Sequence, residues 1–174
     1  MKFNLNKSIE VLERTPITLL AMLHNISLEW TNANEGGDTW CVYDIIGHLI
    51  YGEKTDWISR TEILVSNKPV KNFEAFDRFA QFEESRGKTL DQLLVEFKEL
   101  REKNIEKLLL LNLTEEKFNL KGFHPDLGEV TLSQLISCWV VHDLNHLAQI
   151  SRVMSKQYRE EVGPWIKFLG ILHK

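Results

Sequence analysis

The chain has 174 residues, of which 43% are hydrophobic and 26% are charged, and its formal net charge at pH 7 is −4. This length suits one globular domain with a substantial core, and the absence of any Lys or Arg cluster excludes the electrostatic footprint of a nucleic-acid-binding protein. The N-terminal stretch contains Lys7, Glu10 and Glu13 and no continuous apolar run, so neither a signal peptide nor a transmembrane helix is expected.

Apolar residues recur at helical spacing from Leu5 to Trp30, which predicts a first helix over 5–31. Pro16 is expected to kink this helix or to divide it, because proline removes a backbone hydrogen bond. The segment "NANEGGD" at 32–38 then predicts a loop from its Asn and Gly content.

A second helix is predicted over 40–66, with Asp38 or Thr39 as its N-cap and "SNKP" at 66–69 as its end. The following segment, 67–88, carries phenylalanines three residues apart. This spacing predicts irregular structure or a short helix that lies against the rest of the protein.

A third helix is predicted over 90–112, with Thr89 as its N-cap. The segment "FNLKGFHPDLGEV" at 118–130 alternates apolar and polar residues and contains glycine and proline, which favours a short extended hairpin or an ordered loop. The fourth helix is predicted over 132–157, with Thr131 as its N-cap.

Four amphipathic helices with almost no strand signal predict an all-α four-helix bundle, formed by one domain over residues 1–174. The first connection is short, so the first two helices are expected to be antiparallel neighbours. The second connection has about twenty residues, which exceeds the roughly 2–8 residues usual between bundle helices. This long crossover allows the second and third helices to run parallel.

Two of the six histidines, His142 and His146, stand four residues apart in "VVHDLNHLAQI" of the fourth helix. They share one narrow arc of the helix with Gln149, on the side that faces the core. A buried imidazole needs a hydrogen-bond partner or a metal, and the HxxxH spacing allows two rings to share one ion. Structural histidines in the core, or surface histidines, are the alternative interpretation.

A third imidazole, His48, stands in the apolar run "YDIIGHLIYGE" at 43–53 of the second helix. Together with His142 and His146 it would form a three-histidine site, which suits a divalent transition metal with open coordination positions. Two unrelated buried histidine sites are the other interpretation. Asp143 occupies the position of the glutamate in HExxH zinc proteases, but its carboxylate points about 100° away around the helix, so a protease is not expected.

These motifs resemble the two signatures of the DinB-like superfamily. The stretch "DTWCVYDIIGHLIYGEKTDWISR" at 38–60 is similar to the first, and "TLSQLISCWVVHDLNHLAQISRVM" at 131–154 is similar to the second, in the expected order and spacing. The resemblance implies a four-helix bundle in an up-down-down-up arrangement and a homodimer. It also implies a divalent metal, most often zinc or nickel, whose three ligands correspond to His48, His142 and His146.

The resemblance further implies a function, because some relatives are thiol-dependent transferases that use bacillithiol or mycothiol. The first hypothesis is therefore a metal-dependent thiol S-transferase or isomerase that acts on small electrophiles. A metal-coordinated thiol is strongly acidified, and its thiolate would attack the electrophile. The second hypothesis is a non-catalytic, stress-associated metal-binding bundle, in which the ion joins two helices.

Several side chains are candidates for supporting roles around such a metal. Gln149 could orient a bound water or ligand, and Asp56 could orient a ligand histidine or accept a proton. Glu53 could share these roles, although a solvated helix face is expected for it. Three tryptophans are expected in the core or along the pocket: Trp40, Trp57 and Trp139. Two arginines are candidates for contacts with substrate carboxylates: Arg60 and Arg152.

The two cysteines, Cys41 and Cys138, stand in apolar contexts and form no CxxC pair. Zinc bound by clustered cysteines is therefore excluded. A reduced cytoplasmic protein with two buried thiols is expected rather than a disulfide framework.

Overall fold

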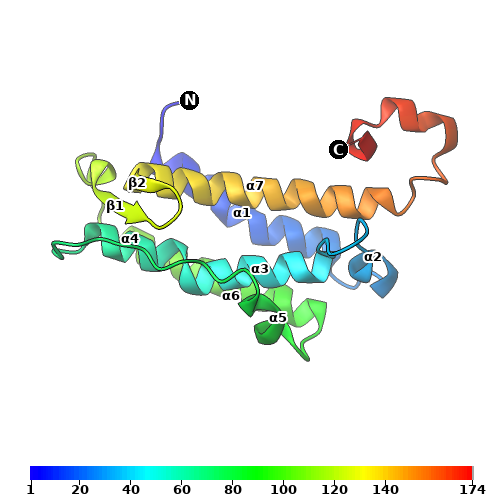
Figure 1. The fold of residues 1–174 in the computed structure, drawn as a ribbon, viewed down its shortest axis with the longest axis horizontal. Helices are drawn as coiled ribbons and strands as arrows, with labels where there is room; N and C mark the ends of the chain where they lie inside the picture. The colour runs from blue at the N-terminus through cyan, green and yellow to red at the C-terminus, as the bar shows by residue number, and fades with distance from the viewer. Residues whose placement is uncertain (174) are drawn as a thin grey trace.

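Four long helices frame the protein in the computed structural model, which describes residues 1–173. In chain order they are α1 (Leu5–Leu23), α3 (Val42–Thr55), α6 (Leu90–Leu110) and α7 (Leu132–Lys156). Figure 1 shows that α1 and α7 run in one direction, whereas α3 and α6 run in the opposite direction. The bundle therefore has the expected up-down-down-up order, with its second and third long helices parallel.

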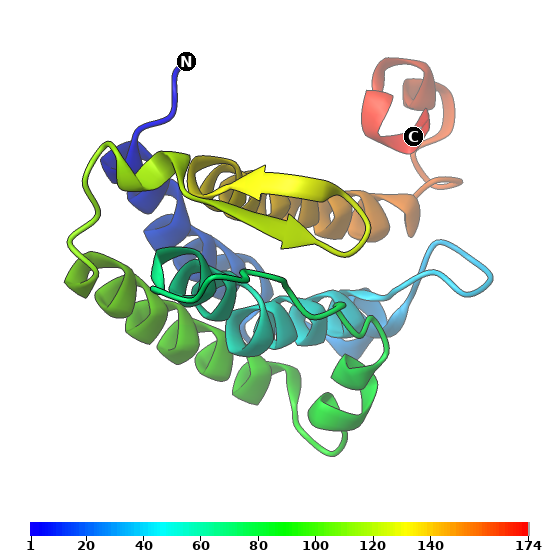
Figure 2. The same ribbon diagram turned by 60° about the vertical axis from the view of Figure 1, so that its left-hand side comes forward.

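The long helices pack so that α1 and α3 lie across the bundle from each other. α1 packs against α6 and α7, and α3 packs against the same two helices. The first two long helices run in opposite directions and are antiparallel, as predicted. The prediction that they are neighbours is wrong, because each packs mainly against α6 and α7. The reason is the long crossover, which carries the chain back along α3 and places α6 beside it (Figure 2).

Shorter elements lie in the connections and at the C-terminal end. The helical ones are α2 (Leu28–Asn32), α4 (Trp57–Val65), α5 (Ala80–Ser85) and the 3-10 helices η1 (Lys117–Asn119), η2 (Gly163–Phe168) and η3 (Gly170–His173). The strands β1 (Lys121–His124) and β2 (Gly128–Thr131) form an antiparallel hairpin, so of the two structures predicted for 118–130 the hairpin is correct. Within residues 1–173, every helix is too short or too polar to cross a membrane.

Pro16 lies inside α1, and the helix runs through it without interruption, so the predicted division at this residue is wrong. Proline has no N–H, and the carbonyl of Leu12, four residues earlier, therefore lacks its helical partner. Nη1 of Arg101 in α6 donates to this carbonyl at 2.8 Å instead. The break in the predicted helix over 5–31 comes later, at a turn where Asn25 has a φ of 57°.

The predicted helix over 40–66 is interrupted at Asp56, which has φ −109° and ψ −72° and separates α3 from α4. Hydrogen bonds from Asp56 N to Gly52 O and from Arg60 N to Asp56 O are kept, at 3.0 and 2.9 Å. Asp56 therefore takes part both in the last hydrogen bonds of α3 and in the first hydrogen bonds of α4.

The N-cap of α3 is Cys41, and neither of the two residues predicted for this role is correct. The backbone N–H of Cys41 donates to the carboxylate of Asp44 at 3.0 Å. Asp38 and Thr39 lie before the helix, because Thr39 closes a turn in which its hydroxyl donates to Gly36 O at 2.8 Å.

A layer of buried polar side chains separates two apolar clusters that fill the two ends of the bundle. This polar layer consists of Glu53, Arg101, Asn104 and Asp143. Arg101 Nη2 donates to Glu53 at 2.8 Å and to Asp143 at 3.0 Å, and Asn104 and Trp139 each donate to Glu53 at 3.0 Å. Glu53, expected on a solvated face, is therefore only 4% exposed, because Arg101 balances its charge inside the bundle.

Candidate metal centre

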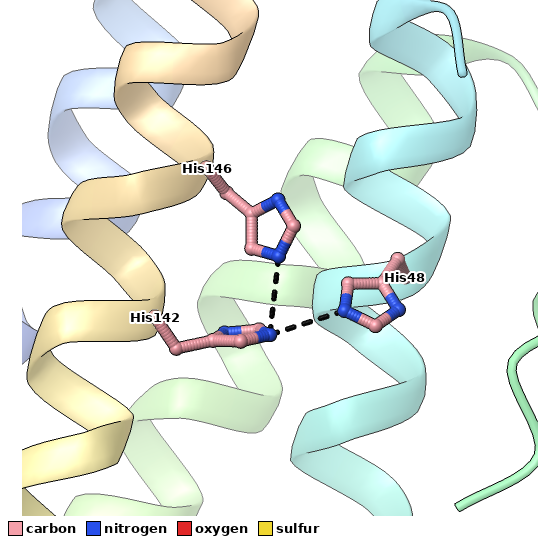
Figure 3. A group of neighbouring side chains, drawn as sticks. All are labelled: His48, His142 and His146. Atoms are coloured by element: carbon pink, nitrogen blue, oxygen red, sulfur yellow. Dashed lines mark hydrogen bonds between the residues drawn. The ribbon is translucent and has the colours of Figure 1, made fainter. Parts of the chain in front are cut away.

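The three histidines predicted as metal ligands come together between α3 and α7. His48 projects from α3, and His142 and His146 project from successive turns of α7 toward the same point (Figure 3). Nε2 of His142 lies 3.1 Å from Nε2 of His48 and 3.1 Å from Nε2 of His146. His48 is 9% exposed and His146 is 6% exposed, whereas His142 is half-buried.

Two glutamines determine which nitrogen carries the hydrogen in two of these rings. Oε1 of Gln81 lies 3.0 Å from Nδ1 of His48, and Oε1 of Gln149 lies 2.8 Å from Nδ1 of His146. A carbonyl oxygen can only accept, so both Nδ1 atoms donate and both Nε2 atoms present a lone pair toward His142. Gln149, expected to orient a bound water or ligand, thus contacts His146.

Hydrogen bonds alone cannot satisfy the three converging nitrogens while the rings are neutral. Nε2 of His142 has at most one hydrogen and can donate it to His48 or to His146, but not to both. One of the two 3.1 Å contacts would then place a lone pair against a lone pair. A cation at the point of convergence would accept all three lone pairs, and neutral imidazole nitrogens are ordinary ligands of transition metals.

The spacing of the nitrogens also fits a metal ion. Tetrahedral zinc sites have Zn–N distances of about 2.0–2.1 Å, which corresponds to a separation of about 3.3 Å between ligand nitrogens. The two observed separations of 3.1 Å are close to this value, and all three ligand atoms lie within 4.8 Å of one another. The donor set and its geometry therefore both fit a divalent ion held by His48, His142 and His146.

Burial keeps the three imidazoles neutral at physiological pH. Burial, together with the neighbouring charge of His146, lowers the pKa of His48 to about 4 and the pKa of His142 to about 2. Burial also lowers the pKa of His146 itself. Because only a neutral imidazole can ligate a metal, these ligands stay in their binding form at pH values where an exposed histidine is protonated.

This burial predicts that the metal-free protein loses stability as the pH falls below about 6.5, the ordinary histidine pKa. In this range the unfolded chain binds protons that the folded protein excludes, so acid favours unfolding. His48 and His142 are each expected to contribute up to about 1.4 kcal/mol per pH unit, until the pH reaches the folded pKa of about 4 for His48 and about 2 for His142. His146 acts in the same direction, because its pKa is also lowered. Urea denaturation with a chelator present, between pH 7.5 and pH 5, measures this slope.

The control is a His142→Phe variant, which removes one titrating ring and keeps an aromatic side chain in the site. Its stability is expected to depend less steeply on pH than that of the wild type. Equal slopes for the two proteins would contradict this account of the buried histidines.

Two of the three tryptophans line the site. The ring centre of Trp40 lies 4.9 Å from that of His48, and the ring centre of Trp57 lies 5.1 Å from that of His142. Trp139 packs deeper in the core, stacked on Trp57 at 5.8 Å. The wall around the histidines is therefore largely aromatic.

A groove of about 710 Å³ borders the site along the outward face of α7. Phe3 lines it from the N-terminal segment, and Cys138, Val141 and His142 line it from α7. Cys138 is exposed and Cys41 is half-buried, so the prediction of two buried thiols is wrong. The reason is that Cys138 lies on the face of α7 that turns away from the core.

Asp56, a predicted partner of the ligands, forms an ion pair with Arg60, and none of its hydrogen bonds within residues 1–173 reaches a ligand histidine. Burial raises the pKa of Asp56 to about 6. The second arginine expected to meet substrate, Arg152, pairs with Glu35 at 2.7 Å. Both arginine side chains therefore form ion pairs with carboxylates of the protein itself.

Two of the remaining histidines lie away from the site. Nδ1 of His24 lies 3.0 Å from a carboxylate oxygen of Asp91, and His124, on β1, accepts a hydrogen bond from the backbone N–H of Asp126 at 3.1 Å. Sequence reasoning missed Gln81 and Arg101. Gln81 stands in the segment 67–88, whose phenylalanine spacing gives no sign of a contact with His48. Arg101 interrupts the apolar stripe of α6 and could have been identified from that position.

Comparison with known proteins gives two results. The sequence model of the DinB superfamily matches residues 12–150. The fold is similar to that of YfiT from Bacillus subtilis, described as a probable metal-dependent hydrolase with an unusual four-helix bundle topology, with a TM-score of 0.72 and 24% sequence identity. The similarity covers 87% of this chain and 86% of that chain. No curated protein sequence matches the chain.

Proposed function

We propose a function from one premise: this chain belongs to the DinB superfamily, whose sequence model covers most of its length. We infer that His48, His142 and His146 bind one divalent transition metal, with zinc or nickel as the ion. The observation that supports this proposal is the convergence of three Nε2 atoms, two of which must present lone pairs. When bound, such an ion supplies a Lewis acid that acidifies a thiol or a water in its remaining position.

We further propose that the protein is a metal-dependent S-transferase or isomerase that acts on a small thiol, of the bacillithiol type, and a small electrophile. In the transfer reaction, the thiolate sulfur bonds to an electrophilic carbon as the leaving group departs with the electrons of the broken bond. The thiol proton passes to solvent. The groove on the outward face of α7 supports this proposal, because His142 is one of its lining residues and its volume of about 710 Å³ suits a small organic molecule.

Hydrolysis is the second candidate activity, and the description of YfiT as a probable metal-dependent hydrolase favours it. In that reaction water takes the place of the thiol as the nucleophile. The same three histidines and the same groove would serve it. A non-catalytic metal-binding role is the remaining alternative.

Metal content tests the common premise. Protein purified without a histidine tag is expected to contain one equivalent of zinc or nickel by elemental analysis. A His142→Ala variant is expected to lose most of it, because the site keeps only two ligands. His24→Ala, which changes an exposed histidine outside the site, should retain the wild-type content. An unchanged metal content in His142→Ala would show that the site is wrongly assigned.

Turnover then separates the candidate functions. The metal-loaded wild type is assayed with small electrophiles in the presence and absence of a low-molecular-weight thiol. Product that requires the thiol supports S-transfer, and product formed in water alone supports hydrolysis. Bound metal without turnover in either arm contradicts both activities and leaves the non-catalytic role.

A further inference from the structure

We propose that Gln81, in the crossover between α4 and α6, is a positioning residue that holds His48 in the tautomer and orientation required for metal binding. This inference rests on the metal site proposed above and assigns a role to a residue outside the three ligands. It joins the metal centre to a connecting segment that lies 33 residues further along the chain.

The crossover is fixed against α3 at the level of His48, so that Gln81 is held in a defined place. The hydroxyl of Tyr43 lies 2.5 Å from Ser85 O and 2.9 Å from Lys88 O, so its one hydrogen is donated to this pair of carbonyls. Gly47 leaves the room that this close approach needs, because a Cβ at that position would lie 2.5 Å from Ser85 Oγ. α5, which carries Gln81, therefore packs directly on the turn of α3 that presents His48.

The side chain of Gln81 is buried, and its amide forms a hydrogen bond through the oxygen. The residue is 1% exposed, and its Oε1 accepts from Nδ1 of His48 at 3.0 Å. Its Nε2 donates to no group in the part of the chain that the structure describes. A buried donor without a partner is costly, so the hydrogen bond to His48 is the one contact that this polar side chain gains.

The direction of this hydrogen bond decides whether His48 can bind a metal. With Oε1 toward the ring, Nδ1 carries the hydrogen and Nε2 is free as a ligand. With the amide reversed, Nδ1 would accept and Nε2 would carry the hydrogen, which would block ligation. Apolar rings flank the His48 imidazole on its other sides. The ring centre of Trp40 lies 4.9 Å from that of His48, and the ring centre of Phe76 lies 5.4 Å from it.

The experiment compares two substitutions of Gln81. Gln81→Met keeps the length of the side chain and removes the acceptor, whereas Gln81→Glu keeps an acceptor at the same place. Zinc affinity is measured by competition with a chromophoric chelator. Gln81→Met is expected to bind zinc about 10–100-fold more weakly than the wild type, the usual effect of losing a partner behind a metal ligand. Gln81→Glu is expected to recover most of that loss.

The matched control is Glu83→Ala, which changes an exposed residue of the same short helix and should leave zinc affinity unchanged. Circular dichroism of the metal-free variants checks that the bundle is folded. If folded Gln81→Met binds zinc as tightly as the wild type, or if Gln81→Glu fails to recover affinity, the role of Gln81 is wrong while the metal site stands. A wild-type protein that binds no zinc overturns both proposals.

A second measurement does not depend on metal. In the metal-free wild type, ¹⁵N spectra of the imidazoles are expected to show His48 with its hydrogen on Nδ1. In Gln81→Met, this preference for the Nδ1–H tautomer is expected to be lost. The same Nδ1–H preference in both proteins would contradict the proposed positioning role.

Discussion

Replacing Arg101 with alanine is expected to lower the free energy of unfolding by about 3–5 kcal/mol, the largest effect of any single substitution considered for this protein. Arg101 is 1% exposed and donates to Glu53, to Asp143 and to the carbonyl of Leu12. Its removal leaves two buried carboxylates without their cation and a buried carbonyl without a donor. Urea denaturation of the metal-free proteins at pH 7.5 measures the difference.

Two further variants make this prediction specific. Arg86→Ala removes an arginine whose ion pair with Glu83 is exposed, and it should change stability very little. Adding Glu53→Gln and Asp143→Asn to Arg101→Met should recover a large part of the loss, because no unpaired charge then remains in the core. A loss in Arg101→Ala no greater than that in Arg86→Ala would contradict the role assigned to the polar layer.

Zinc is expected to stabilise the wild-type protein by about 4 kcal/mol when its free concentration is a thousand times the dissociation constant. For a chain of this size, each 1 kcal/mol raises the melting temperature by about 2–4 °C, so the expected shift is about 8–16 °C. The physical reason is that folding assembles His48 from α3 with two histidines from α7, and the unfolded chain has no such site. Differential scanning calorimetry with and without zinc measures the shift.

Loss of one ligand should remove most of this effect. His48→Ala leaves the two imidazoles of α7 on their own, and its melting temperature at the same zinc concentration is expected to rise far less than that of the wild type. His24→Ala, which lacks exposed contacts with Asp91 and Asn25, should show the full shift. An equal shift in His48→Ala would mean that zinc stabilises the protein at another place.

The histidines could be predicted from sequence because helical periodicity is a local property. Residues 142 and 146 fall on one face of any regular helix, and His48 stands within an apolar helical run. Antiparallel packing of α3 against α7 then brings the three rings together. The phenylalanine spacing predicted a short helix within 67–88, where α5 lies. The hydrogen bond from α5 to His48 has no such signal, since the position of Gln81 depends on how the crossover packs.

The errors over Glu53 and Pro16 share a cause. A sequence pattern assigns a charged residue to solvent and predicts that a proline divides a helix, because each residue is considered without a distant partner. Arg101 is that partner in both cases, as it pairs with Glu53 and donates to the carbonyl that Pro16 leaves free. A single tertiary contact on α6 thus explains two departures from local rules on α3 and α1.

The contact between Arg101 and the Leu12 carbonyl also affects how the protein opens and closes. In α1 alone, that carbonyl has no backbone donor and must be hydrated, so water has to enter the helix beside two apolar turns. Only the arrival of α6 replaces this water with a guanidinium group. Unwinding of α1 near Pro16 therefore exposes the polar layer as well. As a result, α1 and α6 are expected to unfold as one cooperative unit and not as two segments that fray separately.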